Sequence, residues 1–360
     1  MKSLRNLFVL VAMLAIPAFA QELTSDINLT VLDSSGNPIS GASASVTFEP
    51  TNSKASKNTS SSGSVAFRGL RPGGPYTIVV SFGGNSESLS NVSLTVGDTF
   101  RSNVTLSAGS LEEIVTVASK LNTNKDIGFS TSISSDDISK FSSVTRDLKD
   151  FVRLNPWSVA NDASDGQDAE LSIAGGGSRT NDILVDGASY NDDFGLNASG
   201  YPGQASPINL DSIEQLNVRV APSSIEYSNF EGGVIEVVTK GGTNDFKGSV
   251  YSYDRGDSFV GDSVDGRDID QEFDDTSEGF TLGGPIIKDK AFFFVAFESN
   301  DKTTPINYGP VGSGAPFSQP ITIEQVRQIQ TDTQSIYGFD PLLYSSSNSV
   351  TNENTTLRLD

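Results

Sequence analysis

The residue types that most often carry enzyme chemistry are missing from this sequence. Its 360 residues include no histidine and no cysteine. This composition excludes a Ser-His-Asp triad, a Cys-His nucleophile, a disulfide framework and a metal site built from Cys and His. The carboxylates are scattered and form no recognisable acid-base pair. We therefore predict that the chain is not an enzyme and holds no cofactor.

The densest group of chemically active residues is an acidic stretch that contains only two arginines, Arg255 and Arg267. Its acids are Asp257, Asp262, Asp265, Asp268, Asp270, Glu272, Asp274 and Asp275. Carboxylates are hard ligands that suit calcium, but the acids that an EF-hand requires ahead of its glycine are missing before Gly266. A run of acids is also typical of a solvated loop. From the sequence, both interpretations stay open.

The formal net charge of the chain is −21. A strongly acidic chain repels phosphate groups, so we do not expect nucleic acid as a partner. Attachment to an anionic membrane surface through a polybasic patch is excluded by the same argument.

The first residues have the anatomy of a secretory signal peptide over 1–20. Lys2 and Arg5 form a positive start, Leu7–Ile16 an apolar core, and Ala18–Ala20 a small-residue cleavage site. A transmembrane anchor is the alternative, but this run is shorter than the ~20 residues that span a bilayer. No later segment is apolar for long enough. We therefore expect an exported protein that can enter a membrane only as a β-barrel.

Residues 21–108 alternate between apolar and polar in short runs separated by turn residues, which predicts half-buried antiparallel strands of a small β-sandwich. Two turn motifs resemble those of the carboxypeptidase-regulatory-like domain, which is a seven-stranded sandwich. The first motif consists of Asp33, Gly36, Pro38, Ile39, Gly41 and Ala42, and the second of Leu70, Pro72, Gly73 and Tyr76, with Gly74 and Pro75 inserted. The fold is shared with carbohydrate-binding sandwiches, so glycan binding is an alternative that rests on the fold only.

Residues 124–244 mix a helical pattern, expected from Ser134 or Ser135 to about Leu154, with several short strands. Four segments resemble, in order, the plug domain of TonB-dependent transporters. They are Asn181–Gly187, Ile208–Val218, Ile225–Tyr227 and Gly232–Asn244. The family often has Arg-Gly where this chain has Ala174-Gly175, so an arginine contact of the plug is expected to be absent. Thr145–Asp150 and Leu282–Phe294 further resemble the Oar-like branch of the family.

The linker at 109–123 contains a β-branched run with polar flanks, Glu112–Ala118. Such a segment can add a strand to the sheet edge of another protein. It resembles the TonB box, through which these transporters engage an inner-membrane energy coupler. The resemblance implies that the partner-binding residues are Glu113, Ile114, Val115, Thr116 and Val117. The alternative is one more strand of the sandwich or of the plug.

Residues 245–360 are predicted to begin a large outer-membrane β-barrel. Candidate strands cover 246–254, 278–287, 291–299 and a segment from 355, and an amphipathic helix is expected over 321–337. In the third strand, Phe293, Val295 and Phe297 would face lipid. The lumen side would carry Phe294, Ala296 and Glu298. A buried hairpin of a soluble protein is the alternative. Barrels begin at about eight strands, so we expect these residues to be a fragment of a longer chain.

The predicted fold class is therefore mainly β, with a seven-stranded sandwich, an α+β plug and the first barrel strands. The resemblance implies energy-coupled uptake of an unidentified extracellular ligand across the outer membrane of a Gram-negative bacterium. The implied partners are outer-membrane lipid and a TonB-like coupler in the periplasm, where the sandwich and plug would lie. The alternative function is surface adhesion or assembly, with the barrel as an anchor.

Overall fold

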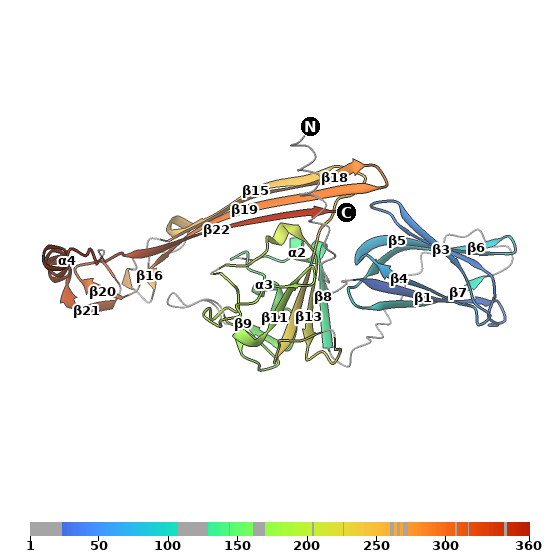
Figure 1. Cartoon of the computed structure of the whole chain (residues 1–360), viewed down its shortest axis with the longest axis horizontal. Coiled ribbons are helices and arrows are strands. Elements are labelled where there is room, and N and C mark those ends of the chain that lie inside the picture. The colour runs from blue at the N-terminus through green and yellow to red at the C-terminus, as the bar shows by residue number, and fades with distance from the viewer. Residues whose placement is uncertain are drawn as a thin grey trace, which may run out of the picture.

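The computed structural model describes residues 24–106, 129–143, 145–160, 170–203, 205–225, 227–259, 263–264, 267–268, 273–306, 308–315, 317–341 and 344–360. Three bodies follow one another along the chain: a β-sandwich, a mixed α/β body, and a sheet of long strands. The long sheet lies along one side of the mixed body, and the sandwich sits beside both (Figure 1). None of the described helices is long and apolar enough to cross a membrane.

The sandwich consists of a three-stranded and a four-stranded sheet. The first has the order β4 (Ser64–Leu70), β1 (Ser25–Asp33) and β7 (Thr99–Leu106), and the second β3 (Ser53–Asn58), β2 (Ser43–Phe48), β5 (Gly73–Phe82) and β6 (Asn85–Leu94). The prediction of a seven-stranded sandwich is confirmed. The prediction of purely antiparallel pairing is wrong for one pair, since β1 and β7 run parallel. The alternation of side chains does not reveal pairing direction, because both arrangements have a period of two.

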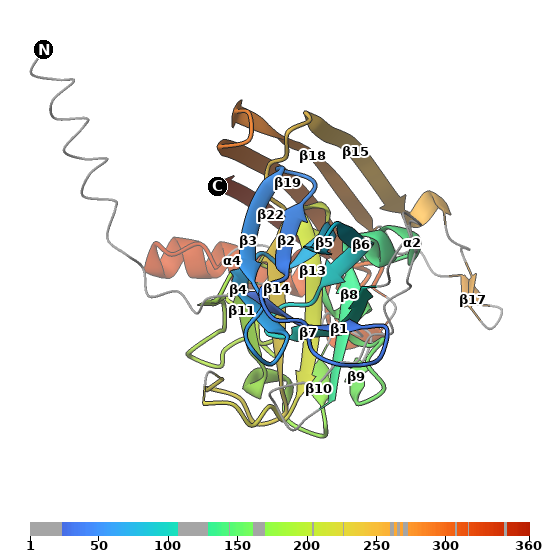
Figure 2. The same ribbon diagram turned by 90° about the vertical axis from the view of Figure 1, so that its right-hand side faces the viewer.

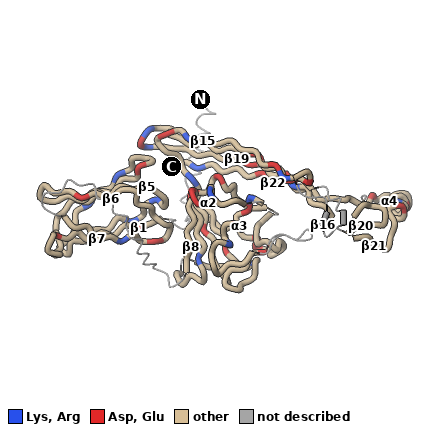
Figure 3. The backbone as a smooth tube through the Cα atoms, turned by 180° about the vertical axis from the view of Figure 1, so that it is seen from behind, with Lys and Arg blue, Asp and Glu red and all other residues tan. Residues whose placement is uncertain are grey.

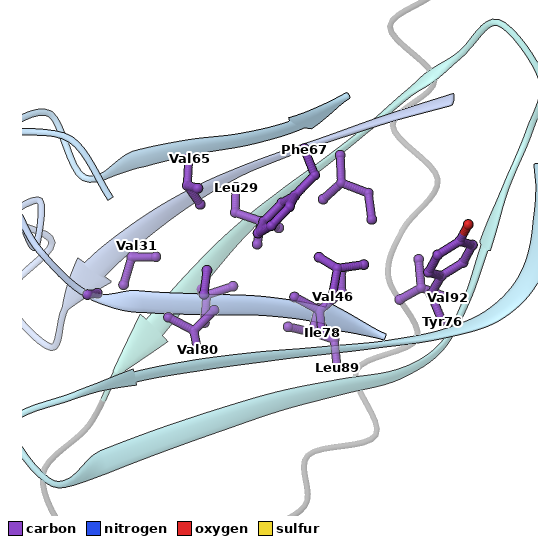
Figure 4. Packing of buried hydrophobic residues seen from close by; sticks show 14 of the residues in the cluster. Leu29, Val31, Val46, Val65, Phe67, Tyr76, Ile78, Val80, Leu89 and Val92 are labelled. Atoms are coloured by element: carbon purple, nitrogen blue, oxygen red, sulfur yellow. The ribbon is translucent and has the colours of Figure 1, made fainter. Parts of the chain in front are cut away.

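The core of the sandwich is the set of alternating apolar residues, which meet between its two sheets. Leu29 and Phe67 from one sheet face Val46 and Ile78 from the other (Figure 4). The turn before β4 requires a glycine. Gly63 has a φ of +71°, and a Cβ atom there would lie 2.7 Å from the carbonyl oxygen of Val31. Only glycine combines this backbone conformation with so close an approach.

The mixed body is built on a five-stranded sheet. Its order is β12 (Ala188–Ser189), β11 (Asp182–Val185), β14 (Gly233–Thr239), β13 (Ile213–Val220) and β8 (Phe129–Ser134). Strands β11 and β14 are parallel and the other neighbours are antiparallel. A small hairpin of β9 (Ser158–Ala160) and β10 (Leu171–Ile173) and two 3₁₀ turns, η1 (Ser178–Thr180) and η2 (Leu210–Ser212), complete it.

The helix expected from Ser134 to about Leu154 is interrupted, so this prediction is wrong in extent. Helix α2 (Ser135–Lys140) begins with a capping box between Ser134 and Asp137, which confirms Ser134 as the N-cap. The backbone becomes extended at Phe141, and helix α3 covers only Lys149–Val152. Between the helices, the hydroxyls of Ser143 and Thr145 donate to Asp150. Short polar side chains that bond locally in this way compete with helix formation.

The long sheet contains four antiparallel strands in the order β15 (Lys247–Gly256), β18 (Asp274–Ile287), β19 (Ala291–Pro305) and β22 (Ser347–Leu359). Seen along the molecule, the sheet arches over the five-stranded sheet of the mixed body (Figure 2). All four predicted strands are confirmed and are longer than predicted. In β19 the buried side chains are Phe292, Phe294, Ala296 and Glu298. The predicted inward face of this strand is therefore confirmed.

The opposite face of this sheet is apolar. The register places Phe280 beside Phe297, and Val295 between Leu282 and Leu357. Charged residues gather towards the ends of these strands and leave the middle largely uncharged (Figure 3). An outward apolar band with polar ends is the pattern of strands that cross a membrane.

Two connections carry small elements of their own. Between β15 and β18 lie η3 (Asp257–Phe259) and the two-residue strands β16 (Ser263–Val264) and β17 (Arg267–Asp268). Between β19 and β22 lie β20 (Tyr308–Val311), β21 (Phe317–Thr322) and α4 (Ile323–Tyr337). The predicted helix is confirmed, and it starts at Ile323 because Thr322 forms a capping box with Gln325. None of the residues of α4 is buried.

Candidate functional site: the contact between the mixed body and the long sheet

One arginine of the mixed body reaches the inner face of the long sheet. Arg146, in the loop between α2 and α3, donates to Asp211 Oδ2 at 2.5 Å and to Glu298 Oε2 at 3.1 Å. Its guanidinium carbon lies 4.7 Å from the ring centre of Tyr251 and 4.3 Å from that of Tyr253. The Tyr251 hydroxyl also donates to Glu298, at 2.9 Å. We name these five residues the Arg146 latch.

The latch depends on local structure at both of its ends. Arg146 has a φ of +52°, a left-handed conformation that turns the chain towards the sheet after α2. Glu298 follows Phe294 and Ala296 on the inward face of β19. Asp211 is placed by η2, where the Asn209 side chain accepts from its backbone N–H. Of these residues, the sequence predicted only the inward position of Glu298, because alternation along a strand is a local signal.

The charges of the latch support one another. The side chains of Arg146 and Glu298 are 14% and 10% exposed. Burial by itself lowers the pKa of the Arg146 guanidinium, but Asp211 and Glu298 outweigh that effect and raise the pKa above its ordinary value. The guanidinium therefore stays charged. Removing it would leave Glu298 poorly solvated beside the Tyr251 hydroxyl, which is costly for a carboxylate.

A second group of polar contacts joins β22 to the mixed body. Arg358 of β22 donates to the carbonyl oxygen of Thr239 at 2.8 Å, and Asn354 donates to that of Ser206 at 3.1 Å. The Asp186 carboxylate organises this contact, because it accepts from both the backbone N–H and the hydroxyl of Thr239. Arg358 also donates to the Thr239 hydroxyl at 3.3 Å and lies 3.8 Å from the Asp186 carboxylate, so the contact combines hydrogen bonds with an ion pair.

The chain segment that connects the two bodies is tied to the turn between β18 and β19. The Asn244 amide donates to Asp289 Oδ1 at 2.7 Å, and the Asp289 N–H donates back to Asn244 Oδ1 at 2.9 Å. Asp289 has a φ of +60°, which asparagine and aspartate tolerate better than other residues with a Cβ atom. The connection therefore leaves the mixed body in a defined direction.

The arginine contact expected to be absent exists, but at another position. Ala174 and Gly175 form a left-handed turn with φ values of +52° and +80°. The buried arginine of this body is Arg219 on β13, which donates to Glu236 on β14 at 2.6 Å. Both side chains are almost fully buried, at 4% and 1% exposure. The prediction failed because it considered only the position after the first strand.

Some predicted features lie outside the described residues. These are the signal peptide, the partner-binding residues Glu113–Val117, and most of the acidic stretch after Asp257. Within the part of the chain that the structure describes, no group of three or more acidic side chains is arranged to hold a metal ion.

We expect the replacement Arg146→Ala to lower the stability of the plug body by about 2 kcal/mol, because charged hydrogen bonds to Asp211 and Glu298 are lost. The measurement is urea unfolding followed by the fluorescence of Trp157, the single tryptophan, which lies in this body. Arg153→Ala is the control, because Arg153 is exposed and follows α3. Equal unfolding midpoints for the two variants would contradict the role of the latch.

Comparison with known proteins identifies three domains along the chain. Residues 26–107 match the carboxypeptidase regulatory-like domain, residues 123–235 the TonB-dependent receptor plug domain, and residues 238–311 an outer membrane β-barrel domain. The three matches follow the order of the sandwich, the mixed body and the long sheet.

Two curated proteins are similar to parts of the chain. The TonB-dependent transporter Oar of Myxococcus xanthus is 35% identical over 137 residues, which are 35% of this chain and 12% of that protein. The probable TonB-dependent siderophore receptor PirA of Acinetobacter baumannii is 29% identical over 188 residues, which are 49% of this chain and 23% of that protein. The chain thus spans less than a quarter of the length of either relative.

Among solved structures, two similar ones are a siderophore receptor and an outer membrane transporter. The siderophore receptor PirA of A. baumannii aligns with a TM-score of 0.36 and 22% identity, over 48% of this chain and 24% of its own. The transporter YddB of Escherichia coli aligns with a TM-score of 0.40 and 15% identity, over 49% of this chain and 27% of its own.

Proposed function

Because the chain combines a TonB-dependent receptor plug with an outer membrane β-barrel domain, we propose that it serves energy-coupled uptake of a ligand through a plugged barrel. Both domains indicate the outer membrane, as the sequence predicted. The proposal concerns the whole protein. The two curated relatives are about four and eight times as long as the stretch that each shares with this chain.

One observation carries the proposal. The plug has a hydrophobic core of its own, and within the described residues that core includes no residue of the long sheet. Polar contacts between the plug and the sheet are made by the Arg146 latch, Arg358 and Asn354. A body that must move within a barrel needs contacts that water can replace, and ionic and hydrogen-bonded contacts have this property, whereas a continuous apolar core does not.

The work for this movement would enter through the linker. We propose that Glu113–Val117 pairs as an extra strand with a TonB-like partner in the periplasm, since main-chain bonds of an added strand give affinity. The linker continues into β8, which lies at one edge of the plug sheet and pairs with β13 from Phe129 opposite Val220 to Ser134 opposite Gln215. A pull on the linker would therefore reach Phe129 first and open this pairing from its end.

The orientation follows from the same proposal. The tight turn at Lys288–Lys290 would face the periplasm together with the sandwich. The connections that carry η3 and α4 would face the outside, because barrel strands are joined by short turns on the periplasmic side and by longer loops on the outer side. The ligand would be bound on that outer side.

A genetic experiment tests uptake against the alternative of surface adhesion. Strains lacking this protein, the inner-membrane coupler, or both are grown with one limiting nutrient at a time, and attachment to a surface is measured in parallel. Uptake predicts a growth defect for the first strain that is not increased in the double mutant. A strain with normal growth on every nutrient and a loss of attachment that does not depend on the coupler would refute uptake and support adhesion.

A further inference from the structure

One turn of the sandwich, Thr95–Asp98 between β6 and β7, is hydrogen-bonded to the plug. The Val96 N–H donates to the Gln215 side-chain oxygen at 3.0 Å, and the Arg219 guanidinium donates to the Val96 carbonyl oxygen at 2.7 Å. Val96 is fully buried. Gln215 and Arg219 are four residues apart on β13, so they lie on the same face of that strand. Together they satisfy both backbone groups of a single residue of the sandwich.

The plug side of this contact is held in place by the plug itself. Glu236 accepts from Arg219 at 2.6 Å and from the Tyr227 hydroxyl at 2.8 Å. The Arg219 guanidinium carbon also lies 5.4 Å from the ring centre of Tyr227. The Asp98 carboxylate is buried beside this group. Burial lowers the pKa of Arg219, but Glu236 and the other neighbours, Asp98 included, raise it overall. The guanidinium is therefore charged and aimed at the sandwich.

Glycine is required where the turn meets Arg219. Gly97 has a φ of +69°, and a Cβ atom there would lie 2.5 Å from an Arg219 guanidinium nitrogen. Any side chain at this position must displace the nitrogen that bonds to Val96. The contact thus requires a glycine where the sandwich backbone approaches Arg219, and a charged arginine that the plug holds in place.

The sandwich also touches the long sheet. The carbonyl oxygen of Pro50 accepts from the Asn244 N–H at 2.8 Å, and Arg71 lies 3.3 Å from Asp360 at the end of β22. Asn244 is the residue that holds the turn between β18 and β19. Figure 1 shows the sandwich beside both the plug and this end of the long strands. The sandwich therefore bridges β13 and the barrel sheet.

The junction is not packed like a core. A cavity of about 730 Å³ lies there, between side chains of all three bodies. Its lining includes Phe48 and Tyr76 of the sandwich, Thr239 of the plug, and Phe292 and Arg358 of the long sheet. The sandwich is thus held by a few directed bonds around an open space, and such a contact can separate without breaking a hydrophobic core.

We propose that the sandwich is a bracket that binds plug strand β13 through Val96 and Gly97 and ties it to the barrel sheet, so that the plug can move only after this contact separates. The movement rests on the proposed function, whereas the bracket does not. Residues 107–128 connect β7 of the sandwich to β8 of the plug. Since β8 pairs with β13 and the sandwich binds β13, both ends of this connection are anchored on the same strand.

The bracket is tested by Gly97→Lys in the full chain. The new lysine side chain would clash with the Arg219 side chain and would repel it, because both are positively charged. The matched control is Gly83→Lys, because Gly83 also has a positive φ in the sandwich but nothing lies within 4 Å of its Cβ position. A second variant, Gln215→Ala, removes the bond to Val96 and leaves Gly97 intact.

The readout is the distance between spin labels on exposed positions of the two bodies, Ser61→Cys and Asp193→Cys. The chain has no native cysteine to interfere. We expect one narrow distance distribution for the unmodified sequence and for Gly83→Lys, and a broad one for Gly97→Lys and, more weakly, for Gln215→Ala. Amide exchange in β13 is expected to accelerate at least tenfold in Gly97→Lys, while exchange in β2 and β5 stays unchanged and shows that the sandwich is folded. A narrow distribution in both test variants would overturn the bracket whatever the function of the protein.

A second arm tests the movement. The probe is vancomycin, an antibiotic too large for ordinary pores. In the whole protein in its native outer membrane, we expect Gly97→Lys to admit several-fold more vancomycin than Gly83→Lys does, even in cells that lack the coupler. A broad distance distribution with unchanged vancomycin entry would show that the sandwich separates but does not restrain the plug. That result would overturn this part of the proposal and leave energy-coupled uptake untouched.

Discussion

Deleting Glu112–Ala118 is expected to abolish ligand uptake and to leave ligand binding at the cell surface at its wild-type level. The outer membrane has no nucleotide supply of its own, so work on the plug must arrive mechanically through a protein contact. If Glu113–Val117 is the strand that the coupler binds, its loss removes the only contact that we propose to transmit this work. The measurement is growth on the nutrient that requires the protein, together with binding of that nutrient to whole cells.

A shorter linker could also reduce uptake, so length needs its own control. Deletion of the seven residues 121–127 shortens the linker equally and should retain uptake. A single substitution sharpens the test, because proline lacks the N–H that a paired strand donates. Val115→Pro should behave as the deletion does, and Val115→Thr should behave as the wild type. Uptake that persists after the deletion would refute coupling through this segment.

Replacing Arg219 by methionine is expected to destabilise the plug by about 3–5 kcal/mol, because Glu236 would remain buried without its cation. That carboxylate also accepts a hydrogen bond from the Tyr227 hydroxyl, at 2.8 Å. The measurement is the urea midpoint followed by Trp157 fluorescence. Trp157 stacks on Phe129, at a distance of 5.6 Å between ring centres, and therefore reports on the start of β8.

The double variant Arg219→Met, Glu236→Met separates lost charge pairing from lost packing. Apolar side chains of similar volume often replace a buried ion pair without loss of stability. We therefore expect the double variant to recover most of the stability lost in the single one. A loss below about 1 kcal/mol in Arg219→Met, the size of an ordinary hydrogen bond, would show that the pair is not essential to the plug.

The sequence alone predicted those parts of the fold that depend on local periodicity. The alternation from Ile27 to Leu106 predicted a sandwich of about seven strands, and the alternation from Phe292 to Glu298 predicted which face of β19 is inward. The acids Asp136 and Asp137 after two serines predicted a helix start at Ser134 or Ser135. These signals work because burial of one strand face, or satisfaction of one helix end, requires residues that are close together in the chain.

The tertiary structure decided everything that joins residues far apart in the chain. Arg146 meets Glu298 152 residues later, and Arg219 meets Val96 123 residues earlier. No local sequence pattern around either arginine identifies its partner, since any carboxylate or carbonyl oxygen can accept a hydrogen bond from an arginine. The parallel pairing of β1 with β7 belongs to the same class, because long-range packing selects among arrangements that the local sequence permits equally.

The candidate site shows the same division. The linker segment Glu113–Val117 was proposed from its composition and its place between two domains, and it lies outside the described residues. The Arg146 latch and the bracket at Val96 have no sequence signature and emerge only when the three bodies are assembled. The sequence by itself thus determined the bodies and their order. How they hold one another was decided by the fold, because isolated charges and backbone groups acquire specific partners only after folding has excluded water from around them.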